Sequence, residues 1–297
     1  MRLRLAGVTE WARERHPAGR NLRKSSPFAS PAWTPTSSKR LQESTTSHNR
    51  TSSAGRSPNG KSAILNPYDD PQVADRYDLH YFGRVETAED QTLQSAILPL
   101  AVSAVVLDLG AGTGLVKALT DPLAYVAVDS SAPMLQHLIS THPEVFTIQA
   151  DLNTSAGIRH LMEEAAFIGP FDLVTCIFSG HFIHSRRLFK AAYELLTPGG
   201  MIVHHGNMPR RRFRRAGLYP EWQNLETHPE YRADTLRERL TQAGFEDVRI
   251  VGMNAVPDWI TRHLSPNTAF RLMSMSRHIP ARWHFHAAGF GRKPYDR

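Results

Sequence analysis

Residues 105–114 read VVLDLGAGTG, and this stretch decides the fold. It opens with a mostly apolar run and passes directly into glycines at 110, 112 and 114. A short apolar run of this kind predicts a buried strand of a parallel sheet. The glycines allow the backbone to turn sharply into a helix and to approach a ligand closely. Because ligands of such sheets bind beyond the carboxyl ends of the strands, the sequence predicts a ligand loop here.

The same pattern continues along the chain. Strands that alternate with helices of about 10 to 12 residues predict right-handed crossovers and a parallel sheet. The expected strands are 104–109, 125–129, 146–151, 171–178, 201–205, 248–253 and 284–290, and the expected helices between them include 132–141, 155–166, 186–196 and 234–243. The sequence Thr-Pro-Gly-Gly at 197–200 is expected to end a helix and lead into a turn. We therefore predict an α/β fold with a doubly wound, mostly parallel seven-stranded sheet.

The spacing of the glycines distinguishes between three kinds of ligand loop. A Walker phosphate loop requires Gly-Lys-Ser/Thr, but Leu115 and Val116 follow Gly114. A dinucleotide fingerprint places its third glycine one position further on, where Leu115 stands. The remaining pattern, an acid followed by glycines at every second position, lacks the wider turn that opens toward a pyrophosphate.

Residues 105–114 resemble the first motif of the class I S-adenosylmethionine-dependent methyltransferases. Further matches follow in the order of that family. Asp129 ends the second strand, Asp151 follows the third, residues 172–174 (Asp-Leu-Val) open the fourth, and 195–200 (Leu-Leu-Thr-Pro-Gly-Gly) precede the fifth. The resemblance covers roughly residues 67–293 and implies S-adenosylmethionine as the cofactor.

The resemblance also implies roles for individual residues. Asp129 would accept hydrogen bonds from both ribose hydroxyls. Asp151 and the amide of Leu152 would contact the adenine, on which Met134 would pack. Gly110 and Gly112 would allow close approach of the methionyl part, and Asp108 would lie near its ammonium group. The full expected cofactor set is Asp108, Gly110, Ala111, Gly112, Gly114, Asp129, Ser130, Met134, Asp151 and Leu152.

The segment after the fourth strand is where this family usually faces its methyl acceptor. His181 is the first candidate for a general base there, and His184 is the second, with His204 and His205 as weaker candidates. Packing or helix capping remains the alternative for each. We predict no metal site, because no acidic third ligand lies near His181 and His184. Aromatic residues that could cover the acceptor, or form an ordinary apolar core, are Tyr77, Tyr81, Phe82, Trp222, Trp259 and Phe270.

The net charge of +7 belongs to the first part of the chain. Residues 1–62 hold 12 Lys/Arg and 3 Asp/Glu, whereas the other residues hold 23 and 25. We predict a disordered, Ser/Pro/Arg-rich tail at 1–62, a helical lid at 63–100 and a methyltransferase domain at 101–297, with acceptor-capping insertions near 207–232 and 255–280. The tail resembles an organellar transit peptide, against which Glu10 and Glu14 count; a flexible tail or an over-long gene model is the alternative.

Several function classes are excluded or disfavoured. Cys176 is the one cysteine, so an intrachain disulfide framework and a multi-thiolate zinc site are excluded. It follows Thr175, whereas cytosine-C5 enzymes need Pro-Cys, and residues 177–180 (Ile-Phe-Ser-Gly) lack the Asn/Asp-Pro-Pro-aromatic motif of amino methylation. No apolar run approaches the ~20 residues that a membrane helix needs. Because both nucleobase-methylation motifs are missing, nucleic acid is not the expected partner, although the arginine run at 210–215 keeps RNA as an alternative.

These observations lead to one main expectation. We expect a cytoplasmic methyltransferase that moves a methyl group to an oxygen, nitrogen or carbon atom of a small-molecule acceptor, in secondary metabolism. The alternatives are an RNA or protein methyltransferase that uses the basic tail and the arginine run, and a catalytically silent methyltransferase-like binding protein.

Overall fold

The computed structural model describes residues 67–81, 97, 99–180, 182–183, 185–207, 231–256, 260, 263–276, 278–284 and 286–295. All of them belong to the compact unit Leu65–Arg297. The predicted tail at 1–62 lies outside the described residues, as do parts of the predicted lid and of both predicted insertions. In the described part of the chain, no helix has the length and apolarity that crossing a bilayer requires.

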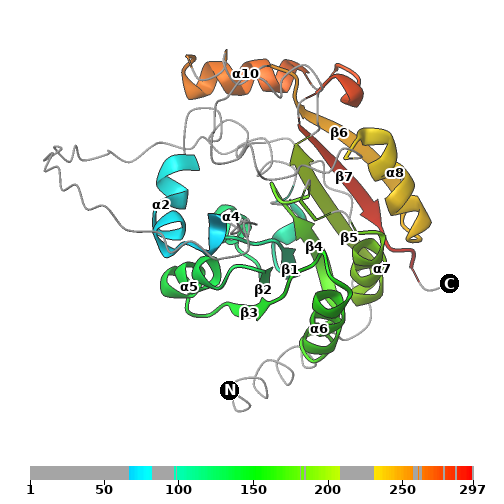
Figure 1. The fold of residues 1–297 in the computed structure, drawn as a ribbon. Helices are drawn as coiled ribbons and strands as arrows, with labels where there is room; N and C mark the ends of the chain where they lie inside the picture. The colour runs from blue at the N-terminus through cyan, green and yellow to red at the C-terminus, as the bar shows by residue number, and fades with distance from the viewer. Residues whose placement is uncertain are drawn as a thin grey trace, which may run out of the picture. The chain divides into compact units, whose positions relative to one another are not determined.

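A seven-stranded sheet organises the described residues, with strand order β3-β2-β1-β4-β5-β7-β6 (Figure 1). The strands are β1 (Val105–Leu109), β2 (Ala124–Asp129), β3 (Phe146–Gln149), β4 (Phe171–Cys176), β5 (Leu196–Asn207), β6 (Glu246–Asn254) and β7 (His286–Arg292). Only β7 pairs antiparallel with its neighbours. The predicted doubly wound, mostly parallel sheet is confirmed.

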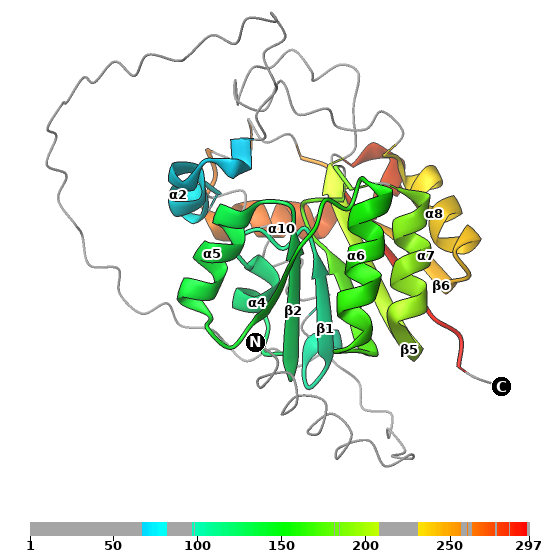
Figure 2. The same cartoon turned by 60° about the horizontal axis from the view of Figure 1, so that its bottom comes forward.

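Helices cover both faces of the sheet. The helices are α2 (Pro71–Tyr81), α4 (Leu115–Leu119), α5 (Ala132–Thr141), α6 (Ser155–Ala166), α7 (Arg186–Leu195), α8 (Ala233–Gln242) and α10 (Pro266–Ser276), with short η1 (Pro67–Asp69) and η3 (Ala281–Trp283). Figures 1 and 2 show α6, α7 and α8 on one face and α4 and α5 on the other. Val116, Leu135 and Leu138 of α4 and α5 are buried against Val106, Ala127 and Leu173 of the sheet.

The helix end predicted at residues 197–200 agrees with the structure, since α7 ends at Leu195. The start of β5 is irregular: Leu196 pairs with Phe171 and Met201 pairs with Leu173, so the register with β4 shifts between these two pairs. Gly199 has a left-handed backbone, with φ of 80°. The amide of Gly199 donates to the carbonyl of Lys293 (2.9 Å), and the amide of Lys293 donates to the carbonyl of Gly200 (2.8 Å). These long-range hydrogen bonds satisfy backbone groups of the irregular segment.

Candidate active site

The glycine loop joins β1 to α4 at the point where the strand order reverses. From β1 the chain continues to β2 and then to β3 at one edge of the sheet, and it returns to β4 on the other side of β1. Such a reversal opens a crevice at the carboxyl ends of the strands, where α/β sheets bind ligands. Gly110, Gly112 and Gly114 all have left-handed backbone angles, with φ of 70°, 54° and 97°. The loop therefore needs glycine at all three positions.

Two of these glycines differ in their surroundings. A Cβ atom at Gly110 would lie 2.5 Å from Oγ of Ser179, which follows β4. A Cβ atom at Gly112 would meet no other heavy atom within 4 Å, its chain neighbours aside. Gly110 is thus wedged against the neighbouring loop, whereas Gly112 faces open space in which a ligand could approach the backbone.

Asp129 connects the end of β2 to the glycine loop. Its Oδ2 accepts the amide of Gly112, and its Oδ1 accepts the amide of Ser131, both at 2.9 Å. Burial raises the pKa of Asp129, and the amides of Ser131, Gly112 and Ser130 oppose the rise. A carboxylate offers about four lone-pair sites, so each oxygen of Asp129 keeps capacity for a further donor such as a ribose hydroxyl.

The residues after Asp129 begin α5 and anchor the segment that precedes the sheet. Oγ of Ser131 accepts the amide of Met134 (3.3 Å) and donates to the carbonyl of Tyr68 (2.5 Å). Ser131 and Met134 are buried, whereas Ser130 is exposed. Ser131 is not among the predicted site residues, although Ser before Ala-Pro is a recognisable helix N-cap.

Asp151 lies at the same edge, just after the end of β3. Gln149 of β3 pairs with Asp129, and the amide of Ala150 donates to the carbonyl of Asp129 (2.9 Å). The carboxylate of Asp151 is exposed and accepts the amide of Asn153 (3.0 Å), while Leu152 is buried. The structure therefore brings the loop, Asp129 and Asp151 into one row along the carboxyl edge.

Asp108 is only 2% exposed and lies behind the loop. Its Oδ1 accepts the hydroxyl of Thr175 (2.7 Å), and its Oδ2 accepts the hydroxyl of Tyr125. Burial is the largest cause that raises the pKa of Asp108 to about 6. The sequence predicted neither partner, because Tyr125 and Thr175 reach Asp108 from the two neighbouring strands.

The predicted catalytic residues His181 and His184 lie outside the described residues. So do Phe82, Trp222, Trp259 and the arginine run. Within the part of the chain that the structure covers, no group of three His, Cys, Asp or Glu side chains could hold a metal ion. Cys176 is buried, and desolvation raises the pKa of its thiol to about 12.

His204 and His205 point to opposite faces of β5. Nε2 of His204 lies 3.2 Å from the carbonyl of Ile183, and its Nδ1 lies 3.3 Å from the hydroxyl of Tyr231. A carbonyl only accepts, so Nε2 carries the hydrogen and Nδ1 accepts from Tyr231. His204 is fully buried, and its ring packs on that of Phe189 in α7, with centroids 4.8 Å apart.

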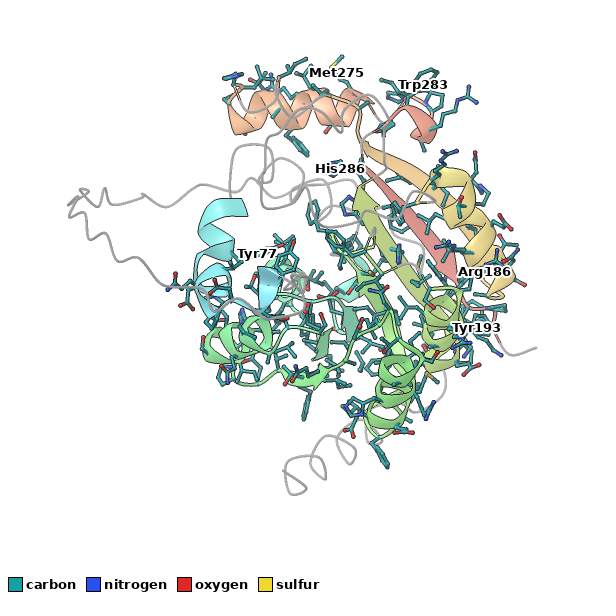
Figure 3. The ribbon with its side chains drawn as sticks, in the orientation of Figure 1. Tyr77, Arg186, Tyr193, Met275, Trp283 and His286 are labelled. Atoms are coloured by element: carbon teal, nitrogen blue, oxygen red, sulfur yellow. The ribbon has the colours of Figure 1, made fainter. Side chains whose placement is uncertain are left out.

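His205 belongs to a different group of rings. The amide of Phe178 donates to Nδ1 of His205 (3.3 Å), and the two rings lie 4.6 Å apart, edge to face. His286, at the start of β7, lies 5.9 Å from the ring of His205 (Figure 3). His286 is not among the predicted site residues, since only the pairing of β5 with β7 brings it to this edge.

The residues present fit S-adenosylmethionine. The cofactor offers hydroxyl, amino and ammonium donors, and the edge offers the carboxylates of Asp129 and Asp151 as acceptors. The open side of Gly112 leaves room for close approach to the loop. The donor and acceptor chemistry of this edge is thus complementary to that of the cofactor.

Comparisons with known proteins agree with this geometry. The model of the methyltransferase domain family matches residues 81–250, more than half of the chain. No curated protein matches this chain.

Three solved structures are similar to this chain at low sequence identity. One is an S-adenosylmethionine-dependent methyltransferase of Thermotoga maritima (15% identity, 75% of this chain and 97% of that chain, TM-score 0.48). Another is an S-adenosylmethionine-dependent methyltransferase of Mesorhizobium loti (18% identity, 70% of this chain and 99% of that chain, TM-score 0.44). The third is the plantazolicin methyltransferase BamL in complex with a substrate analogue and S-adenosylhomocysteine (14% identity, 75% of this chain and 90% of that chain, TM-score 0.50).

The family match confirms the resemblance that the motifs carry. With it, the expectation of an enzyme with S-adenosylmethionine as cofactor is confirmed. The chain belongs to the class I S-adenosylmethionine-dependent methyltransferases.

Proposed function

We propose that the chain methylates an oxygen, nitrogen or carbon atom of a small molecule in secondary metabolism. The observation that carries the proposal is the hydrogen bond from the Gly112 amide to Oδ2 of Asp129 (2.9 Å). It fixes a carboxylate and an open backbone loop together at the crevice of the sheet. When bound, S-adenosylmethionine supplies an electrophilic methyl group on a positively charged sulfur.

Each cofactor residue has a proposed task. Asp129 binds the ribose hydroxyls, and Asp151 with the Leu152 amide binds the adenine, against which Met134 packs. Gly110, Ala111, Gly112 and Gly114 hold the methionyl part, with Ser130 at the ribose side. Asp108 precedes the loop in β1, and the hydrogen bonds that its carboxylate accepts from Tyr125 and Thr175 connect β1 to β2 and β4.

His181 remains our proposed general base, and His184 is the second candidate. An oxygen nucleophile becomes more reactive when a nearby imidazole takes its proton. The fixed tautomer and full burial of His204 argue against that residue. We expect His181→Ala to lower turnover at least about tenfold, because a general base usually contributes about 10²- to 10⁴-fold, with little change in cofactor affinity. Unchanged turnover would remove His181 from this role.

A small-molecule acceptor is supported by what the chain lacks and by one structural neighbour. Residues 177–180 do not carry the motif of nucleobase amino methylation. BamL, which shares the fold, is a methyltransferase of plantazolicin. The competing proposal, methylation of RNA, would use the arginine run at 210–215.

The test has two stages. Calorimetry on the full chain should first detect binding of S-adenosylhomocysteine. Isotope-labelled methyl groups from S-adenosylmethionine should then appear in members of a panel of hydroxylated aromatics, amines and active-methylene compounds. Label that enters total RNA or protein substrates, and no member of the panel, would overturn the proposed acceptor class.

A further inference from the structure

Three rings meet at the carboxyl end of β5, and we name Phe178, His205 and His286 the acceptor wall. Phe178 lies edge to face with His205 at 4.6 Å and with His286 at 6.3 Å, and the two histidine rings are 5.9 Å apart. His205 is fully buried, whereas Phe178 and His286 are half-buried. The wall therefore has a fixed base and two rings with surface left for another molecule.

Phe178 has a backbone conformation that costs energy. Its φ is +56°, in the left-handed region that is unfavourable for a residue with a Cβ atom. The hydrogen bond from its amide to Nδ1 of His205 holds it there. Ordinary core packing does not require such a conformation, and strained residues of this kind concentrate at functional sites.

The wall lies next to the loop that holds the cofactor. Ser179, the neighbour of Phe178, has its Oγ within 3.2 Å of the carbonyl of Leu109 and 3.1 Å of that of Gly110. Because β7 runs antiparallel, its first residue pairs with the last residue of β5, which brings His286 to the same edge (Figure 3). A molecule on the wall would thus lie beside the methyl donor.

The chemistry of the wall defines the molecule that fits. Nδ1 of His205 accepts the Phe178 amide, so in the neutral ring the hydrogen is on Nε2. Ring faces and edges favour stacked or edge-to-face contact with another aromatic ring.

We propose that the acceptor wall binds the methyl acceptor, and that this acceptor carries a planar aromatic ring. The proposal rests on the proposed function, because it requires the cofactor at the adjacent loop. It makes Phe178 and His286 specificity-determining residues, separate from the proposed base His181.

The test compares α-naphthol with its saturated counterpart decahydro-α-naphthol, which keeps the carbon skeleton and the hydroxyl group but is neither aromatic nor planar. Equilibrium dialysis would measure both against the full chain saturated with S-adenosylhomocysteine. We expect α-naphthol to bind about fivefold tighter or more, and His286→Ala to remove most of that preference, since one aromatic pair accounts for about two- to tenfold in affinity. His286→Phe keeps a ring at this position and should retain the preference. His278→Ala, at an exposed site, is the matched control and should change nothing.

The outcomes separate the two proposals. Failure of S-adenosylhomocysteine to bind the wild-type chain would refute the proposed function itself. With that binding intact, three results would overturn the acceptor wall: no binding of α-naphthol, equal affinity for the two probes, or a preference that His286→Ala leaves unchanged. If His286→Ala does not fold, Phe178→Leu, which keeps an apolar side chain without a ring, is judged by the same ratio of affinities.

Discussion

The two halves of the carboxyl edge are built from different materials. At the β1–β2–β3 side, a carboxylate and backbone amides meet directly, as in the bonds of Asp129 to Gly112 and Ser131. At the β4–β5–β7 side, the contacts are between rings, with Phe178, His205 and His286 in one group. The first half offers fixed polar groups with defined directions, and the second offers polarizable surface.

This difference suggests that one half of the edge suits binding of the cofactor and the other suits binding of the acceptor. Hydrogen bonds to a carboxylate impose strict geometry, which suits a cofactor that is always the same molecule. Ring contacts tolerate a range of positions and substituents. A change in the first half should therefore alter cofactor affinity or stability, and a change in the second should alter the choice of acceptor.

The largest expected effect is at Gly110, on the β1–β2–β3 side, which is the half proposed to bind the cofactor. In Gly110→Ala, the new Cβ would lie 2.5 Å from Oγ and 2.6 Å from Cβ of Ser179, and 2.8 Å from Cδ1 of Ile183. We expect the free energy of unfolding to fall by about 3 kcal/mol or more, because overpacking adds about 1–3 kcal/mol to the cost of a left-handed alanine. Chemical denaturation would measure it.

Gly112→Ala is the matched comparison. Its backbone is also left-handed, but a Cβ there meets open space. We expect a smaller loss of stability, about 1–2 kcal/mol, together with weaker binding of S-adenosylhomocysteine, because the methyl group would occupy the approach to the loop. Equal losses of stability in the two variants would contradict this account of the loop.

The second effect concerns Asp108 and pH. Burial raises its pKa from 3.8 to about 6, so the folded chain favours the protonated carboxyl. The resulting contribution to stability is complete below about pH 4 and is lost as the pH rises through about 6. At about 1.4 kcal/mol per pK unit, this amounts to about 3 kcal/mol.

Asp108→Asn imitates the neutral carboxyl at every pH. We expect the unfolding free energies of wild type and variant to be similar near pH 4, and the variant to become the more stable one near pH 7. Asp121→Asn, at an exposed position, should run parallel to wild type. A constant difference between wild type and Asp108→Asn across this range would rule out the proposed titration.

The two halves also differ in how far the sequence predicted them. The glycines and Asp129 are only 15 to 19 residues apart and carry a spaced motif, so the local sequence is enough to predict that they lie together at one end of the sheet. Phe178 and His286 are brought together by the antiparallel pairing of β7, which no local pattern records. The partners of Asp108 were missed for the same reason, because both come from neighbouring strands.

The third effect is on cofactor affinity at Asp129. Asp129→Ala removes the carboxylate that the ribose hydroxyls are proposed to contact. We expect S-adenosylhomocysteine to bind more weakly by about 1.5–3 kcal/mol, the usual contribution of a hydrogen bond to a charged group. Asp129→Asn, which keeps one acceptor oxygen, should lie between the two. Calorimetric titrations that superimpose for all three proteins would exclude Asp129 from the cofactor site.

The smallest effect tests the opposite face of β5. Tyr231→Phe removes the hydroxyl that lies 3.3 Å from Nδ1 of His204, and both residues are buried. We expect unfolding to become easier by about 1 kcal/mol, the net contribution of one hydrogen bond, with cofactor affinity and the preference for α-naphthol unchanged. Since His204 and His205 are adjacent in the chain, a change in that preference would show that the face under α7 also shapes the acceptor site, and the separation of roles between the two histidines would fail.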